Sequence, residues 1–282
     1  IIQAYNAKKY ISNCIQSILS QNFSKKKYEI IIINDASKDK TQRICNKFKK
    51  KNKFIKVLNN KKNLGVSTSR NLGVKSAFGK YVIFADSDDA LKKNSLKNLN
   101  KILSKDEVDL LIALNLTKKE KKIYSNKFHK KRNIFNNKDL NTFFKFLNSG
   151  IDFKFYAWNY ILSRKCFIKN NIYFKKQIRL FEDNEFTARV LCSVKKITLY
   201  KDAFHKRNER FSSLTRSMEF ESTISCLKTT NELCKILKSN KLIFEKKKFL
   251  HGRINIMIKK LKIYLLTCDK QQIKKICHFI KR

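Results

Sequence analysis

Strand-like and helix-like segments alternate along the first hundred residues of this chain. The run YEIIIIN at 28–34 is apolar without a break, as in strands that are buried on both faces of a sheet. Residues 7–21 carry apolar side chains at helical spacing, among them Tyr10, Cys14 and Ile18. Such alternation favours a mostly parallel sheet covered by helices on both faces. The expected strands are 1–2, 28–34, 54–60 and 81–85, and the expected helices are 7–21, 41–50 and 66–78.

Polar side chains stand where three of these expected strands end. Tyr5 and Asn6 follow the first strand, and Asp35 follows the second. Asp86 and Asp88 follow the last. Ligands of open parallel sheets bind at the carboxyl ends of the strands, so we expect these side chains to line one site.

The acidic run from Asp86 to Asp89 is the strongest chemical signal in the chain. Carboxylates at the mouth of a buried strand can hold a hard cation, Mn²⁺ or Mg²⁺, together with a diphosphate. The alternative is that the run caps the expected helix at 90–103, since Asp is a good N-cap. The run alone leaves both interpretations open.

Beyond residue 100 the pattern is less regular. Residues 100–150 are rich in lysine, with one expected strand at 109–114, and residues 219–282 are expected to be helices with basic faces. In these helices apolar residues recur at helical spacing, which favours packing on the core or on a twin subunit over a membrane-surface helix. The residues of this stripe are Ile254, Met257, Ile258, Leu261 and Leu265.

The net charge of +43 suggests an anionic partner. However, the basic residues are mostly lysines spread along the whole chain, in a sequence without proline, and this skew fits a biased genome composition. A dedicated nucleic-acid binder more often gathers arginine and exposed aromatics on one face. We therefore favour contact with an anionic membrane surface over a nucleic-acid partner.

The cysteines and the ends of the chain bear on its compartment. Eight cysteines are scattered without a CxxC pair, which indicates neither a zinc site nor a disulfide framework and favours a reduced, cytosolic compartment. No apolar run reaches the roughly 18 residues of a membrane span, and no signal peptide is recognised. The chain opens without Met at an apolar pair, so we expect the first strand to be incomplete.

Four ordered blocks in the first hundred residues resemble family 2 glycosyltransferases with the GT-A fold, of the bacterial cell-surface glycan type. Later segments extend the resemblance to about residue 215: Trp158-Asn159, residues 181–186, and His205 through Ser213-Leu214-Thr215. The four blocks are Ala4-Tyr5-Asn6, Asn34 through Asp39, Asn63 through Gly73, and Gly79-Lys80-Tyr81 leading to Asp86 through Asp89.

The resemblance implies a fold and a division of the chain. The expected fold is α/β, a Rossmann-like, mostly parallel GT-A sheet with a C-terminal helical extension. The nucleotide-sugar-binding half would span 1–100, the acceptor-binding half 101–218, and a basic helical region 219–282. Two residues depart from the family pattern: Gln3 replaces a common Pro, which we expect to alter only a turn. Ala36 replaces a Gly, so we expect the backbone there to avoid positive φ.

For the donor side, the resemblance implies that Asp88 contacts the cation, while Asp86 faces the ribose or a metal-bound water. Asp35 would accept from the uracil N3–H, and Tyr5 would stack on or flank the base. Arg70 would contact the base or the diphosphate. The alternatives are that Asp35 and Asp39 only stabilise a turn and cap the following helix, and that Arg70 forms a surface ion pair.

For the acceptor side, the family pattern favours Asp183 as the general base, with Glu182 as the alternate. Neighbouring helical positions point in different directions, so we expect only one of the two to face the site. Trp158 would form a sugar-stacking wall, with a core role as the equal alternative. His205 and Arg207 would approach the diphosphate, or be ordinary basic surface residues.

The resulting hypothesis is an inverting, metal-dependent hexosyl- or N-acetylhexosaminyl-transferase. It would move a sugar from a nucleotide-diphosphate donor, favoured to be a UDP-sugar, to a glycan or lipid-linked glycan at the cytosolic face of a membrane. A homodimer through the C-terminal helices is left open. A nucleotidyltransferase would need a Gly-rich phosphate loop, which IIQAYNAKK lacks, and a non-catalytic nucleic-acid binder would bind with a steep salt dependence.

Overall fold

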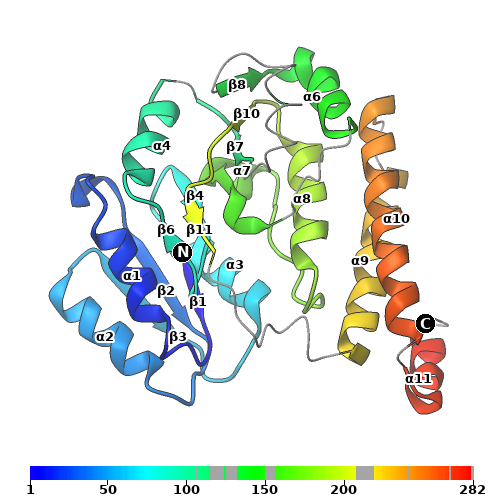
Figure 1. Cartoon of the computed structure of the whole chain (residues 1–282), viewed down its shortest axis with the longest axis horizontal. Coiled ribbons are helices and arrows are strands. Elements are labelled where there is room, and N and C mark those ends of the chain that lie inside the picture. Colours follow the sequence, from blue (N-terminus) through cyan, green and yellow to red (C-terminus); the bar gives the residue numbers. More distant parts are fainter. Residues whose placement is uncertain are drawn as a thin grey trace.

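Two sheets flanked by helices form the body of the protein (Figure 1). In Figure 1 the parallel sheet with α1 and α2 lies at one side of the molecule, and the long C-terminal helices lie at the other. The computed structural model describes residues 1–105, 107–114, 124, 132–149, 156–207, 219–239, 242–266 and 268–280.

The first sheet is parallel throughout, as predicted. Its strand order is β3-β2-β1-β5, and every residue of the central strand β2 (Ile30–Asn34) is buried. Ile11 and Ile15 of the first helix pack in one core cluster with Ile32, while Ile31 and Ile33 pack in another, so both faces of the sheet are covered. The remaining elements are β1 (Ile2–Ala4), β3 (Ile55–Asn59), α1 (Ile11–Leu19), α2 (Thr41–Lys51) and α3 (Val66–Ser76), with a 3-10 turn η1 (Lys25–Lys27).

The segment at 81–85, predicted to be one strand, is two. β4 (Tyr81–Ile83) pairs antiparallel with β9 (Tyr160–Ser163) in the second sheet, and β5 (Ala85–Asp86) pairs parallel with β1. Between them Phe84 is 1% exposed and makes edge contacts with the rings of Phe167, Phe174 and Phe186. The chain therefore passes from one sheet to the other at Phe84 and delivers Asp86 to the edge beside β1.

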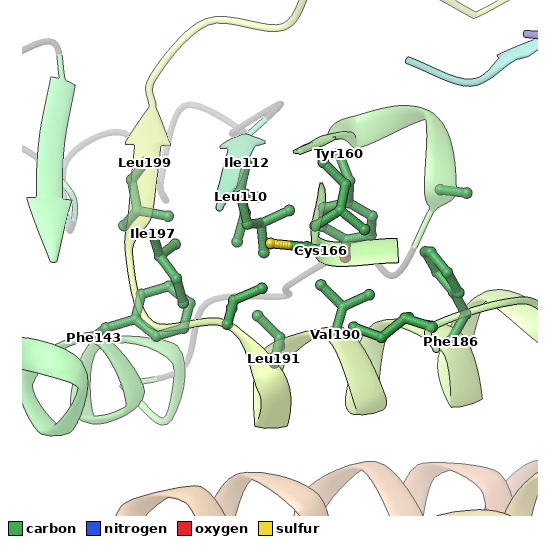
Figure 2. Packing of buried hydrophobic residues seen from close by; sticks show 14 of the residues in the cluster. Leu110, Ile112, Phe143, Tyr160, Cys166, Phe186, Val190, Leu191, Ile197 and Leu199 are labelled. Atoms are coloured by element: carbon green, nitrogen blue, oxygen red, sulfur yellow. The ribbon is translucent and has the colours of Figure 1, made fainter. Parts of the chain in front are cut away.

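The second sheet is mixed, with the order β4-β9-β7-β10-β8. Only β7 (Leu110–Ala113) and β10 (Ile197–Tyr200) are parallel neighbours in it, and β8 (Arg132–Phe135) is antiparallel to β10. The helices between and after these strands are α6 (Leu140–Leu147), α7 (Arg164–Lys169) and α8 (Glu182–Ser193), with the 3-10 turns η2 (Asn137–Asp139) and η3 (Ala157–Asn159). Figure 2 shows the side chains that join strands β7 and β10 to α8: Leu110, Ile112, Ile197, Leu199, Phe186, Val190 and Leu191.

A short antiparallel ribbon connects the two halves of the chain. It pairs β6 (Ala90–Leu91) with β11 (His205–Lys206), placing His205 directly opposite Leu91. Helix α4 (Ser95–Leu103) follows β6, and its Ser95 hydroxyl donates to the carbonyl oxygen of Phe204 at 3.0 Å. The residues just after the acidic run are thus tied to the segment that leads into His205.

The C-terminal helices pack on the body of the molecule. They are α9 (Glu219–Ser239), α10 (Phe244–Leu266) and α11 (Lys270–Ile280). Leu250, Ile254 and Met257 of α10 are buried in a cluster with Ala188 of α8, which confirms the predicted packing on the core. Ile258, predicted to belong to the buried stripe, is 37% exposed instead. None of the described helices has the length and apolar character that a bilayer crossing requires.

Candidate active site

One buried arginine joins carboxylates from both halves of the chain. Arg70 lies on α3 and is 3% exposed. Its Nη2 donates to Asp86 Oδ1 at 3.2 Å, and its Nη1 donates to Glu182 Oε1 at 2.9 Å and to Asp183 Oδ1 at 2.7 Å. The predicted donor-side residue Asp86 and the predicted base Asp183 therefore converge on one guanidinium group. The alternative that Arg70 forms a surface ion pair is wrong, because the Arg70 side chain is buried.

Both carboxylates at the start of α8 face this site, although only one was expected to do so. Phe181, the residue before the helix, has φ 63°, a left-handed conformation that is unfavourable for a bulky side chain. It leaves Glu182 and Asp183 in the first turn, where both reach the same nitrogen of Arg70. Burial, and then the charge of Asp183, raises the pKa of the Glu182 carboxyl. Burial also raises the pKa of Asp183, against the attraction of Arg70.

The third acidic residue of this helix has a different environment. Glu185 is fully buried and pairs with Arg189 one turn later, whose Nη2 donates to it at 2.7 Å. The Arg189 Nη2 also donates to the backbone carbonyl of Tyr173 at 2.6 Å. The carboxylate of Glu185 is therefore engaged by Arg189, which in turn ties α8 to the backbone at Tyr173.

The acidic run forms a compact cluster of oxygen atoms. One carboxylate oxygen from each of Asp86, Asp88 and Asp89 lies within 4.8 Å of the others. The run is not a helix cap, because α4 begins only at Ser95, after β6. Hard carboxylate ligands this close together fit Mg²⁺ or Mn²⁺. Asp89 was not among the predicted ligands, although it belongs to the same acidic run.

Gln3 is a site residue that the sequence analysis missed. It lies within β1, opposite Asp86 of β5 in the parallel register, and its side-chain Nε2 donates to Asp86 Oδ1. The expectation that it only alters a turn is therefore wrong. A proline at this position could not make the bond, so the departure from the family pattern was itself the available signal.

Asp35 anchors the loop between β3 and α3. It is 4% exposed, and its carboxylate accepts from the Leu64 and Gly65 backbone N–H groups at 2.9 and 2.8 Å and from the Asn60 amide at 2.6 Å. The start of α2 is held by Asp39 instead, which accepts from the Thr41 backbone N–H at 2.9 Å. Asp35 is therefore not a helix cap, and its contact with a nucleobase stays a prediction.

The turns after β1 and β2 are joined side by side. The Lys38 backbone N–H donates to Asn6 Oδ1 at 2.9 Å. Tyr5, next to Asn6, is 43% exposed, as expected of a residue that would flank a nucleobase. Asn6 and Ala36 have φ 48° and 57°. The expectation for Ala36 is wrong: it takes the left-handed conformation, at a cost of about 1 kcal/mol, because the surrounding bonds hold the turn.

Aromatic residues lie next to Asp183. The Trp158 ring stacks on Tyr156 at 5.1 Å between centroids and 9° between planes, and the backbone N–H of Ala157 between them donates to Asp183 Oδ2 at 3.2 Å. Trp158 is only 6% exposed, which favours its core alternative, while Tyr156 is partly exposed. A sugar-stacking role for Trp158 stays a prediction.

The two basic residues predicted for the diphosphate differ in environment. His205 is 4% exposed, and its ring lies edge-on to Trp158 at 5.6 Å. Within the part of the chain that the structure describes, neither ring nitrogen has a hydrogen-bond partner. Burial lowers the pKa of His205 to about 4, so the ring is neutral at pH 7 and is not an ordinary basic surface residue. Arg207 is exposed, with its guanidinium 5.8 Å from the Tyr156 ring centroid. The motif at 213–215 lies outside the described residues.

A parallel sheet with an acidic cluster at its carboxyl edge, facing a carboxylate pair from the second half of the chain, has a candidate site where open α/β sheets bind their ligands. Residues 1–168 match the family model described as Glycosyl transferase family 2, and the chain belongs to this family.

Curated relatives match most of this chain. The uncharacterized glycosyltransferase EpsJ of Bacillus subtilis is 26% identical over 76% of this chain and 62% of its own length. The poly(ribitol-phosphate) β-N-acetylglucosaminyltransferase TarS of Staphylococcus aureus is 27% identical over 78% of this chain and 37% of its own length. The chain thus spans less than two thirds of the length of these relatives.

Solved structures share the fold. A crystal structure of S. aureus TarS 1-349 in complex with UDP superimposes with a TM-score of 0.73 at 23% identity, covering 98% of this chain and 76% of that one. The mannosyltransferase PcManGT of Pyrobaculum calidifontis, in complex with GDP-Man and Mn²⁺, gives 0.59 at 12% identity, covering 99% of this chain and 78% of that one. The predicted α/β GT-A fold with a C-terminal helical region is confirmed.

Proposed function

We propose that the protein is an inverting glycosyltransferase that moves a sugar from a nucleotide-diphosphate donor, a UDP-sugar, to a glycan or lipid-linked glycan. The observation that carries the proposal is the convergence of Asp86 with Glu182 and Asp183 at Arg70. It brings a donor-side carboxylate of the parallel sheet and a carboxylate pair from the second half into one site. An inverting transfer needs both within reach of the same anomeric carbon.

On the donor side, Asp88 and Asp86, with Asp89 beside them, would hold Mn²⁺ or Mg²⁺. When bound, the ion stabilises the charge that builds on the departing diphosphate. Tyr5 and Asp35 would contact the nucleobase of the donor, and His205 and Arg207 would lie toward its diphosphate.

On the acceptor side, Asp183 would accept the proton of the acceptor hydroxyl. The hydroxyl oxygen then attacks the anomeric carbon from the face opposite the diphosphate, so the bond to the leaving oxygen breaks as the new bond forms and the configuration inverts. Glu182 is the alternate base. Asp183 is the better candidate because both of its oxygens are held, one by Arg70 and one by the Ala157 N–H.

The nature of the substrates is supported by the relatives. TarS is named as an N-acetylglucosaminyltransferase acting on poly(ribitol-phosphate), and the relative GgaB of Bacillus subtilis as a minor teichoic acid biosynthesis protein. We therefore propose assembly of a cell-surface glycan, with a UDP-linked hexose or N-acetylhexosamine as donor. A location at the cytosolic face of a membrane, with lysines facing anionic lipid, is part of the same proposal.

Thermal melting with Mn²⁺ and UDP, GDP, CDP or dTDP tests the donor assignment. A ligand that binds only the folded state adds about 2.7 kcal/mol of stability at a hundredfold excess over Kd, so the melting temperature should rise with UDP and Mn²⁺ together. Asp88→Asn should abolish the metal-dependent part, and chelation should do the same in the wild type. Glu107→Gln, at an exposed carboxylate that pairs with Lys80 on the surface, is the matched control.

Other outcomes would redirect the assignment. A larger rise with GDP would change the donor class. No rise with any nucleotide, together with tight and steeply salt-dependent binding of DNA or RNA that survives Asp88→Asn, would replace the enzyme with a nucleic-acid binder.

A further inference from the structure

We propose that Arg70 positions the catalytic carboxylate Asp183 relative to the donor-side carboxylate Asp86, and that it does not bind the nucleotide. The inference rests on the proposed function and assigns Arg70 a role different from the base or diphosphate contact expected from the sequence.

The hydrogen bonds of Arg70 are directed at protein carboxylates. Its Nη1 donates to Glu182 and Asp183, and its Nη2 donates to Asp86. Two donors remain: the second N–H of Nη2 and the Nε N–H, which is buried and has no hydrogen-bond partner among the described residues. With two N–H groups on each Nη, both donors of Nη1 are used within the protein.

Aromatic rings pack against one side of the guanidinium. Its central carbon lies 5.1 Å from the ring centroid of Phe174 and 5.8 Å from that of Phe84. The residue is 3% exposed. A diphosphate is bound by N–H groups that point outward to solvent. The guanidinium of Arg70 is buried instead, and three of its five N–H groups are bonded to protein carboxylates.

The bonds of Asp183 show what Arg70 does there. Arg70 holds Oδ1 at 2.7 Å, and the Ala157 backbone N–H holds Oδ2 at 3.2 Å. The plane of the carboxylate is therefore set from two sides, by α3 and by the segment at the start of η3. Since Arg70 also holds Asp86, one rigid, planar group sets the distance between the Asp183 carboxylate and Asp86 at the edge of the parallel sheet. Small displacements of a reacting group cost large factors in rate, about a hundredfold for 1 Å.

Charge explains why a guanidinium is used here. Three carboxylates surround one buried cation, and without it Asp86, Glu182 and Asp183 would repel one another and move apart. A lysine carries one nitrogen at the end of a flexible stem and cannot hold three carboxylates in a forked geometry. Arg70→Lys therefore retains the charge and removes the geometry.

The test compares turnover with donor binding in Arg70→Lys. We expect kcat for sugar transfer to fall roughly a hundredfold, in line with a base displaced by about 1 Å. The apparent affinity for UDP with Mn²⁺, taken from the melting shift, should stay within twofold of the wild-type affinity. Arg189→Lys is the matched control: it alters the pair between the partly exposed Arg189 and the buried Glu185 on α8, which makes no contact with Arg70 among the described hydrogen bonds, and should leave kcat unchanged.

A second variant guards against misfolding of the first. Arg70→Gln combined with Glu182→Gln removes one positive and one negative charge, so the buried site gains no net charge. It should fold, bind UDP with Mn²⁺, and show the same loss of kcat.

The outcomes separate this inference from the proposed function. Loss of the UDP shift with kcat retained at saturating donor would place Arg70 in the nucleotide site and overturn the inference. Unchanged kcat in both Arg70→Lys and the double variant would also overturn the inference. Turnover by the wild-type protein would in that case still support the proposed function. Absence of glycosyl transfer by the wild type, in the presence of donor binding, would instead count against the proposed function.

Discussion

At the scale of single residues, the site depends on side chains whose partners lie far away in the sequence. Asp86 accepts from Gln3 and Arg70 on the same oxygen, Oδ1, which directs its bonds toward the protein. Asp35 and Asp39 share one acidic turn yet hold different loops, the first the loop before α3 and the second the start of α2. These aspartates therefore have different structural roles, which depend on the groups that surround each of them.

The pH dependence of turnover follows from the carboxylate pair at this scale. Burial raises the pKa of Asp183 and of Glu182, and only the ionised base can accept a proton. Because the pKa of Asp183 is raised, its carboxyl becomes protonated at a higher pH than an ordinary aspartate, whose pKa is about 3.9. We therefore expect kcat to fall as the pH is lowered through this higher range. The kcat profile from pH 4 to 9 checks this.

The neighbouring carboxylate supplies a control for that profile. Removing the negative charge of Glu182 with Glu182→Gln lowers the repulsion on Asp183, so the acidic limb should move to lower pH. Asp183→Asn should abolish turnover at every pH. An acidic limb at the position of a free aspartate, unmoved by Glu182→Gln, would contradict the assignment of this pair.

At the scale of elements, the C-terminal helix α10 supports the start of α8. Arg253 Nη2 donates to Asn184 Oδ1 at 2.7 Å, and Asn184 directly follows Asp183, the proposed base. Lys260 Nζ lies 4.6 Å from the ring centroid of Phe181, the left-handed residue before the helix. The helical region beyond residue 219 therefore contacts both sides of the Glu182-Asp183 pair, in addition to extending the chain.

Arg253→Gln tests this support. Hydrogen bonds to charged groups contribute about 1.5–3 kcal/mol, so we expect the free energy of unfolding to fall by an amount of this order, together with a decrease in kcat. Denaturant titration and steady-state kinetics measure the two effects. Lys259→Gln, on an exposed position of the same helix, should change neither. Reduced stability with an unchanged kcat would limit α10 to a structural role.

At the scale of the whole molecule, the core is shared between the halves of the chain. Val74 and Phe84 from the first hundred residues lie in one cluster with Phe186 of α8 and Phe249 of α10. A second cluster joins α8 with α9 and α10 through Ala188, Cys226 and Leu250. The predicted division at residues 100 and 218 stays a prediction about function, since the packing crosses both points.

Leu250→Ala tests whether the chain unfolds as one unit. Leu250 is 1% exposed, and truncating a buried leucine costs about 2–5 kcal/mol. If the clusters cooperate, calorimetry should show one transition shifted to lower temperature. Ile263→Ala, at a residue of the same helix that is 61% exposed, should shift it little. Two separated transitions, only one of them moved, would show that the helical region unfolds independently.

Much of the first half of the fold could be predicted because its signals are local. The apolar run at 28–34 and the helical spacing at 7–21 define elements by themselves, and parallel pairing then brings Asp35 and Asp86 to one edge. The break of 81–85 at Phe84 could not be predicted, because periodicity is the same whether a strand stays in one sheet or passes to another. The orientation of Glu182 was also missed, since a backbone outlier at Phe181 places the first turn.

The sequence by itself determined the α/β class, the family and the residue types of the site, because these depend on local patterns of apolar, acidic and turn-forming residues. Tertiary structure alone decided that Gln3 bonds Asp86, that Trp158 and His205 are buried, and that Arg70 holds three carboxylates rather than facing solvent. The physical reason is the distance in sequence between the partners: Gln3 and Asp86 are 83 residues apart, and Arg70 is 112 and 113 residues from Glu182 and Asp183. Their proximity depends on how both sheets and α8 pack together.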